Sequence, residues 1–280
     1  MNIKITSDST CDLSKELVDK FNIEIIPLTV VKGDESFKDG IDIMPADIFA
    51  HVAAGGDLCS TAALSVGDYL DVFNKYAGEY DGILHINIGS GFSCSYQNAC
   101  LAADDFDNVR VIDSQNLSTG QGLVVLKACE LAKTCQSLDE LHAQVQAFTE
   151  KVEASFLLDQ LKYMVKGGRC SSAAALGANL LNLKPCIEVK NGKMGVVKKY
   201  RGNYAKCLSN YVKDRLSNRD DLDMGTLFVT HTPVIDDCEN AVKEAVDACS
   251  PFENVYWTEA GCTVSCHCGP GTLGVLFVRK

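Results

Sequence analysis

The first half of the chain alternates short apolar segments with amphipathic ones, and this alternation constrains the fold more than any other feature. Apolar runs typical of buried strands lie at residues 3–5, 83–88 and 109–112. Segments with the apolar spacing of helices lie between and after them, for example at residues 68–76 and 120–134. Strands joined by helices form parallel sheets with right-handed crossovers. We therefore predict an α/β domain with a parallel sheet over residues 1–153.

The second half of the chain has a mixed pattern. Asn191-Gly192 lies between strand-like segments at residues 185–189 and 194–199, and this dipeptide favours a two-residue hairpin turn. Further strand-like segments at 226–230, 254–257 and 273–278 are separated by helical patterns at 204–216 and 236–249. This pattern predicts a second, α+β domain with a mixed or antiparallel sheet over residues 154–280.

Charge and composition exclude several classes of function. The 280 residues carry a formal net charge of −11 without any run of Lys or Arg, which argues against a nucleic-acid partner and against an anionic membrane surface. No apolar stretch reaches the length of a membrane span, and the N-terminus lacks the pattern of a signal peptide. We expect a cytoplasmic protein without stable membrane insertion, whose fourteen cysteines are mostly free thiols.

The segment 86–96 is the strongest candidate for a ligand site. A buried strand ends here, Gly89-Ser90-Gly91 turns the chain, and a helix begins near Cys94. Open α/β sheets bind ligands beyond the carboxyl ends of their strands, and a helix N-terminus offers unpaired N–H groups to an anion. The pattern predicts an acidic ligand beside Ser93 and Cys94. A plain turn with a serine that caps the helix explains the same residues.

Two Asp-Ser pairs follow predicted strands of the same sheet. Asp8-Ser9 follows the first strand and Asp113-Ser114 the strand at 109–112. Parallel strands end at one edge, so Asp8, Ser9 and Ser114 become candidate ligand-binding residues together with Ser93. Asp and Ser are also common turn residues after a strand, and this alternative remains open.

A basic residue follows a pair of glycines at 167–169. Gly167-Gly168 interrupts a helical pattern and presents Arg169 on a tight loop. A guanidinium in such a place can hold an anion. The alternative is a glycine that ends a helix beside an exposed arginine.

Cys262, Cys266, His267 and Cys268 raise the possibility of a zinc or redox module. Zinc sites draw their cysteines from spaced pairs at two places in the chain, and this sequence has no second C-x-x-C pair. We therefore expect no metal site. The turn at Gly269-Pro270-Gly271 is expected to form a rigid loop that aims His267.

A hydrolase of acyl esters is a further alternative. It would use Ser93 as nucleophile with His85, His231 or His267 as base. The segment GSGFS lacks the second glycine of the G-x-S-x-G motif, which weakens this interpretation.

These segments together resemble the DegV family of bacterial fatty-acid-binding proteins over nearly the whole chain. The landmarks are Asp8-Ser9-Thr10, Asp39-Gly40, Thr61 before Gly67-Asp68-Tyr69, Phe92-Ser93, Asp113-Ser114, Gly167-Gly168-Arg169, Arg201, and His267 before Gly269-Pro270-Gly271. The sequence departs from the family at Ala62-Ala63, at Cys94, and at Cys266 and Cys268, which flank His267.

The resemblance implies a function. It implies two α/β domains with a long-chain fatty acid between them, its carboxylate held by Thr61 and Ser93 and its tail in a buried apolar tunnel closed by residues 154–280. Family members called FakB present the acid to a separate ATP-dependent fatty acid kinase in phospholipid metabolism, and an acyltransferase is a further candidate partner. Residues matching Arg169, Arg201 and His267 are tied to that transfer step. The protein would then be a ligand-presenting subunit, without a catalytic cofactor of its own.

Overall fold

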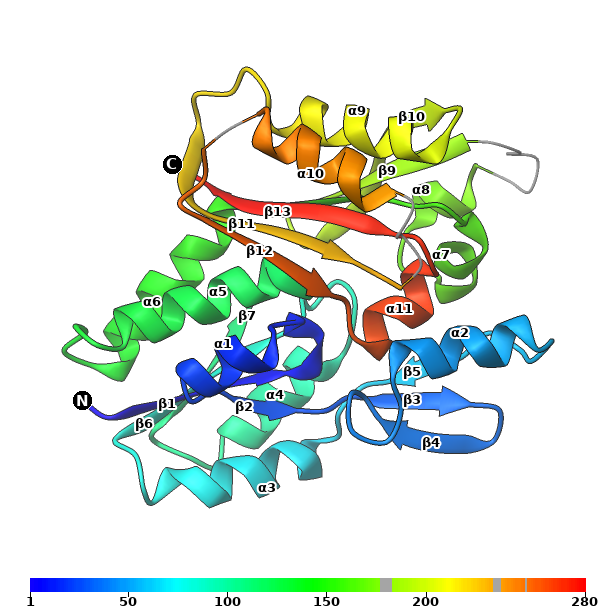
Figure 1. Cartoon of the computed structure of the whole chain (residues 1–280). Coiled ribbons are helices and arrows are strands. Elements are labelled where there is room, and N and C mark those ends of the chain that lie inside the picture. Colours follow the sequence, from blue (N-terminus) through cyan, green and yellow to red (C-terminus); the bar gives the residue numbers. More distant parts are fainter. Residues whose placement is uncertain (177–182, 234–237, 250) are drawn as a thin grey trace.

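A computed structural model describes residues 1–176, 183–233, 238–249 and 251–280. Within them the chain forms three sheets and the helices that cover them (Figure 1). No helix in these parts of the chain is both long and apolar enough to cross a bilayer.

The first sheet is parallel, as predicted, with the strand order β2-β1-β6-β7. Its strands are β1 (Ile3–Asp8), β2 (Glu24–Ile26), β6 (Gly82–Asn87) and β7 (Val109–Asp113). Helices α3 (Val66–Ala77) and α4 (Ser95–Ala103) cover one face, and α1 (Lys15–Lys20), α5 (Ser118–Leu131) and α6 (Leu138–Phe148) cover the other. All six residues of β6 are buried, because helices cover both sides of this central strand.

A small antiparallel sheet, β4-β3-β5, lies beside the first one (Figure 1). It consists of β3 (Thr29–Lys32), β4 (Glu35–Lys38) and β5 (Ser60–Ala62), and α2 (Pro45–Ala53) connects β4 to β5. The sequence pattern did not predict this sheet, because strands of three or four residues are too short to show a clear alternation.

The second large sheet is mixed, as predicted, with the order β10-β9-β8-β13-β11-β12. Its strands are β8 (Val152–Leu157), β9 (Leu183–Lys190), β10 (Lys193–Arg201), β11 (Leu222–His231), β12 (Asn254–Glu259) and β13 (Leu273–Arg279). Helices α9 (Tyr204–Leu216) and α10 (Glu239–Asp247) pack on one face, and the other face packs on α5. The division of the chain into domains at residue 153 stays a prediction.

The predicted hairpin turn is present between β9 and β10. Asn191 and Gly192 both have positive φ angles, 51° and 67°, as its two central residues. The turn packs on the loop at residues 89–95, where a Cβ atom on Gly91 would overlap the carbonyl oxygen of Gly192. This close approach joins the second sheet to the end of β6.

The remaining helices are short and lie where the two halves of the chain meet. They are α7 (Leu161–Gly167), α8 (Ser171–Ala174), α11 (Cys262–Cys268) and the 3-10 turns η1 (Ser9–Cys11) and η2 (Thr149–Lys151). The turn expected at residues 269–271 is present, and it directly follows α11, whose last turn carries His267. The carboxylates of Asp12 and Asp39 accept hydrogen bonds from the first N–H groups of α11, and such distant partners leave no local signal.

Gly91 provides a test of this packing. Gly91→Ala should lower the free energy of unfolding by about 1–3 kcal/mol, since the new methyl group must displace backbone atoms. Gly195→Ala in β10 is the control, because a Cβ atom there meets nothing within 4 Å. Urea-induced unfolding measures both, and equal stabilities of the two variants would show that the loop does not pack on the hairpin.

Candidate functional site

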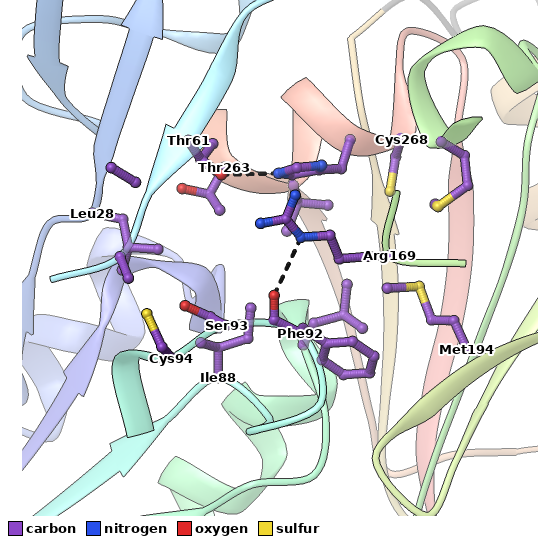
Figure 2. Close-up of a pocket in the computed structure, with 16 residues that line it drawn as sticks. Leu28, Thr61, Ile88, Phe92, Ser93, Cys94, Arg169, Met194, Thr263 and Cys268 are labelled. Atoms are coloured by element: carbon purple, nitrogen blue, oxygen red, sulfur yellow. Dashed lines mark hydrogen bonds between the residues drawn. The ribbon is translucent and has the colours of Figure 1, made fainter. Parts of the chain in front are cut away.

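A cavity of about 150 Å³ lies where the first sheet, the small sheet, α7 and α11 meet (Figure 2). Its polar lining residues are Thr61, Ser93, Cys94, Arg169, Thr263 and His267. The rest of the wall is mostly apolar and includes Leu28, Ile88, Phe92, Leu117, Met164 and Met194. We call this space the head-group cavity. Such an apolar hollow with a few polar groups is typical of a small-molecule site.

The loop at residues 89–95 brings Ser93 to the cavity. Phe92 N–H donates to the carbonyl oxygen of Gly89 (2.9 Å), which tightens the turn after β6. Ser93 Oγ accepts from the N–H of Ser95 (3.2 Å) at the start of α4 and also lines the cavity. One hydroxyl therefore both accepts from the first N–H of the helix and lines the cavity, so the two interpretations of this loop are compatible. The exposed thiol of Cys94 lies beside it.

Thr61 and His267 meet across the cavity from segments 206 residues apart. Thr61 Oγ1 lies 2.9 Å from His267 Nε2 (Figure 2). Burial, together with the nearby charge of Arg169, lowers the pKa of His267 to about 4. The ring is therefore neutral at neutral pH.

Arg169 supplies the positive charge of the cavity. Gly168 ends α7 in the left-handed conformation, with φ of 69°, and Arg169 follows it. The guanidinium donates to the carbonyl oxygens of Gly167 (2.7 Å) and Phe92 (3.4 Å) and so reaches the loop that carries Ser93. Both interpretations of the glycine pair hold, because Gly168 ends the helix and Arg169 lines the cavity.

Asp8, Ser9 and Ser114 are not among the residues that line the head-group cavity. Asp8 is fully buried and accepts from the N–H groups of Ile88 (2.7 Å) and Thr10 (3.0 Å). Burial raises the pKa of its carboxyl group, although these hydrogen bonds act in the opposite direction. Ser114 Oγ donates to the carbonyl oxygen of Asn116 (3.2 Å). Asp8 thus holds the chain at Ile88, just before the loop at 89–95, and Ser114 holds the turn at Asn116, whose carbonyl oxygen accepts from the N–H of Gly89 (2.8 Å).

Arg201 also lies outside the cavity lining. It is the last residue of β10 and is exposed. The resemblance had grouped Arg201 with Arg169 and His267, but only Arg169 and His267 line the cavity.

Asp39 and Thr263 help to build the site, although the sequence did not single them out as site residues. Asp39 accepts from the N–H groups of Cys262 (2.8 Å) and Thr263 (3.1 Å) and from Thr263 Oγ1 (2.7 Å). Ser9 Oγ donates to the same carboxylate (3.0 Å). The Asp39-Gly40 pair was a signal for Asp39 in the family resemblance, whereas nothing in the sequence pointed to Thr263.

The geometry does not pair Ser93 with a histidine. His85 Nδ1 lies 2.8 Å from Thr6 Oγ1 in the buried core, and burial lowers its pKa to about 3. His231 Nδ1 lies 3.1 Å from the carbonyl oxygen of Thr232. Ser93 Oγ lies 2.9 Å from Ser95 Oγ, and among the described residues no histidine is hydrogen-bonded to it. The described residues therefore place no hydrogen-bonded base at Ser93.

The cysteines of helix α11 are buried among apolar side chains. Cys262, Cys266 and Cys268 are buried free thiols, and burial raises the pKa of Cys268 to about 12. Over the described parts of the chain, no group of three or more His, Cys, Asp or Glu side chains is placed to hold a metal ion. The three thiols pack as small apolar side chains.

The chain is similar in sequence and fold to proteins of one known family. A family model described as "Uncharacterised protein, DegV family" matches residues 2–280. A DegV domain-containing protein of Clostridium acetobutylicum is 32% identical over 99% of both chains. Two solved structures each align with this chain over the full length of both chains. One is a DegV family protein from Thermus thermophilus described for its fatty acid binding, with 28% identity and a TM-score of 0.89. The other is DegV, a fatty acid binding protein from Bacillus subtilis, with 26% identity and a TM-score of 0.82.

The neutral state of His267 predicts a dependence of stability on pH. An unfolded histidine binds a proton near pH 6.5, whereas folded His267 does so only near pH 4, so acidification through this window favours unfolding. Relative to His267→Gln, the wild type should lose roughly 3 kcal/mol of unfolding free energy between pH 7 and pH 4.

Urea unfolding at several pH values measures this difference. The same substitution at His142, on α6 and outside the cavity lining, controls for the removal of a histidine as such. A difference between wild type and His267→Gln that stays constant over this range would contradict a neutral, buried His267.

Proposed function

The chain belongs to the DegV family, and on that premise we propose that it binds a long-chain fatty acid in the head-group cavity. The hydroxyls of Thr61 and Ser93 would hold the carboxylate, with the thiol of Cys94 beside it. The observation that carries this proposal is that these two hydroxyls and the guanidinium of Arg169 line one cavity whose other walls are mostly apolar (Figure 2).

The electrostatics of the cavity suit one carboxylate. A buried ion without partners is costly, so a bound carboxylate needs donors or a positive charge. Because His267 is neutral at neutral pH, Arg169 supplies the charge, and Thr61 and Ser93 supply the hydrogen bonds. Asp8, Ser9 and Ser114 would contribute indirectly, since they hold the loop at 89–95 and Asp39 in place.

The tail would supply most of the affinity. Burial of a methylene group contributes about 0.8 kcal/mol, so a chain of some 15 methylenes offers on the order of 12 kcal/mol before the costs of ordering. Leu28, Ile88, Phe92, Met164 and Met194 provide apolar walls for it. The relatives from Thermus thermophilus and Bacillus subtilis, both described as binding fatty acids, support this ligand class.

We further propose that this cytoplasmic protein presents its bound acid to a separate ATP-dependent fatty acid kinase, which forms an acyl phosphate for phospholipid synthesis by an acyltransferase. The chain carries no G-x-x-x-x-G-K-[ST] motif, so ATP would come with the partner. Arg169 is exposed at the cavity, Arg201 is exposed at the end of β10, and His267 contacts Thr61. These three residues are candidates for the transfer step, in which the protein itself would not be the enzyme.

Substitution of the two hydroxyls tests the carboxylate site. Ser93→Ala and Thr61→Ala should each weaken fatty-acid binding about tenfold, the effect of one lost hydrogen bond to a charged group. Titration with hexadecanoic acid measures the dissociation constants, and mass spectrometry of extracted lipid identifies what the purified protein carries.

Ser90→Ala is the matched control. Ser90 lies on the same loop but donates to Asp113 (2.5 Å) and does not line the cavity, so this variant should bind like the wild type. Unchanged affinity in the Ser93→Ala/Thr61→Ala double variant would refute the site. A wild-type protein that neither carries nor binds any fatty acid would refute the function.

A further inference from the structure

A series of buried polar side chains leads from the core of the first sheet to Ser93. Its members are Asp8 at the end of β1, Asn87 at the end of β6, Tyr69 on α3 and Ser95 at the start of α4, and all four are fully buried. None of them lines the head-group cavity. We call this series the buried relay. Polar groups buried to this degree are hydrogen-bonded, so their partners determine which way each proton points.

The direction of the buried relay is fixed at Asn87. Asn87 Nδ2 donates to Tyr69 Oη (2.7 Å) and to Asp8 Oδ2 (3.4 Å). In the opposite orientation of this amide, its carbonyl oxygen would face the carboxylate oxygen of Asp8, and two acceptors would meet. Tyr69 Oη therefore accepts from Asn87, and its own proton needs a different partner.

Ser95 is the partner that remains for the proton of Tyr69. The Tyr69 hydroxyl also interacts with the side chain of Ser95, and burial raises the pKa of Tyr69, so the phenol keeps its proton at neutral pH. A serine that accepts this proton still has its own to donate. Ser95 Oγ lies 2.9 Å from Ser93 Oγ and can donate to it.

The Ser93 oxygen then has two donors from one residue. It accepts from the N–H of Ser95 (3.2 Å) and from Ser95 Oγ. A hydroxyl has two acceptor positions and one proton. With both acceptor positions occupied, Ser93 directs its proton into the head-group cavity, which it lines.

We propose that Tyr69 is a positioning residue that acts through Ser95 and fixes the hydroxyl of Ser93 as a hydrogen-bond donor to the ligand. A carboxylate offers only acceptors, whereas the NH2 of a primary amide at the same place would meet another donor. The buried relay thereby favours an acid over an uncharged amide of the same length. This inference rests on the proposed function and adds to it a residue outside the cavity lining that sets the preferred head group.

A double-variant cycle tests whether Tyr69 acts through Ser93. In Tyr69→Phe, which loses only the hydroxyl, Ser95 can accept the proton of Ser93 and withdraw it from the ligand. The affinity for hexadecanoic acid, measured by titration calorimetry, should fall roughly fivefold, the effect of one hydrogen bond. In a Ser93→Ala background the same substitution should change the affinity by less than about twofold. No loss in the wild-type background, or an equal loss in both backgrounds, would overturn the inference.

Tyr76→Phe is the matched control for the loss of a phenol hydroxyl. Tyr76 lies on the same helix, but its hydroxyl donates to Glu24 (2.7 Å) and it does not line the cavity. This variant should bind hexadecanoic acid like the wild type, and a loss as large as that in Tyr69→Phe would overturn the inference.

A comparison of two ligands keeps the inference testable if Tyr69→Phe does not fold. Wild-type protein should bind hexadecanamide at least about tenfold more weakly than hexadecanoic acid, because the amide brings a donor to a donor and lacks the charge. Equal affinities for the two ligands would overturn the inference. Absence of binding of either ligand by the wild type would instead refute the proposed function.

Discussion

The carboxylate of Asp39 determines where helix α11 lies, and the rest of the site depends on that position. Asp39 is buried and satisfies two N–H groups and one hydroxyl at the start of a helix that lies more than 220 residues later in the chain. A negative charge at this end of a helix is favourable, because the first N–H groups have no partners within the helix. Helix α11 then brings Thr263 and His267 to the head-group cavity.

Burial then determines the chemistry that the cavity can support. His267 is neutral at neutral pH and contacts Thr61, while Ser93 Oγ contacts Ser95 Oγ. Arg169 remains as the positive charge, held toward the loop at 89–95 by its bond to the Phe92 carbonyl oxygen. A positive charge beside two hydroxyls suits the carboxylate of the proposed ligand.

Features that depend on local patterns could be predicted from the sequence. The alternation of apolar segments indicated the parallel sheet, Asn191-Gly192 indicated the hairpin, and Gly168 indicated the turn that presents Arg169. Features that depend on distant partners could not. Thr61 was identified only through the family resemblance, because β5 is too short to show a pattern. Helix α11 was missed because its N-terminal partners lie far away in the sequence.

A crystal structure of the protein with hexadecanoic acid tests the central claim most directly. The account predicts that the carboxylate lies in the head-group cavity, within hydrogen-bonding distance of Thr61 Oγ1 and Ser93 Oγ. Electron density that places the carboxylate outside this cavity, or away from both hydroxyls, would contradict it.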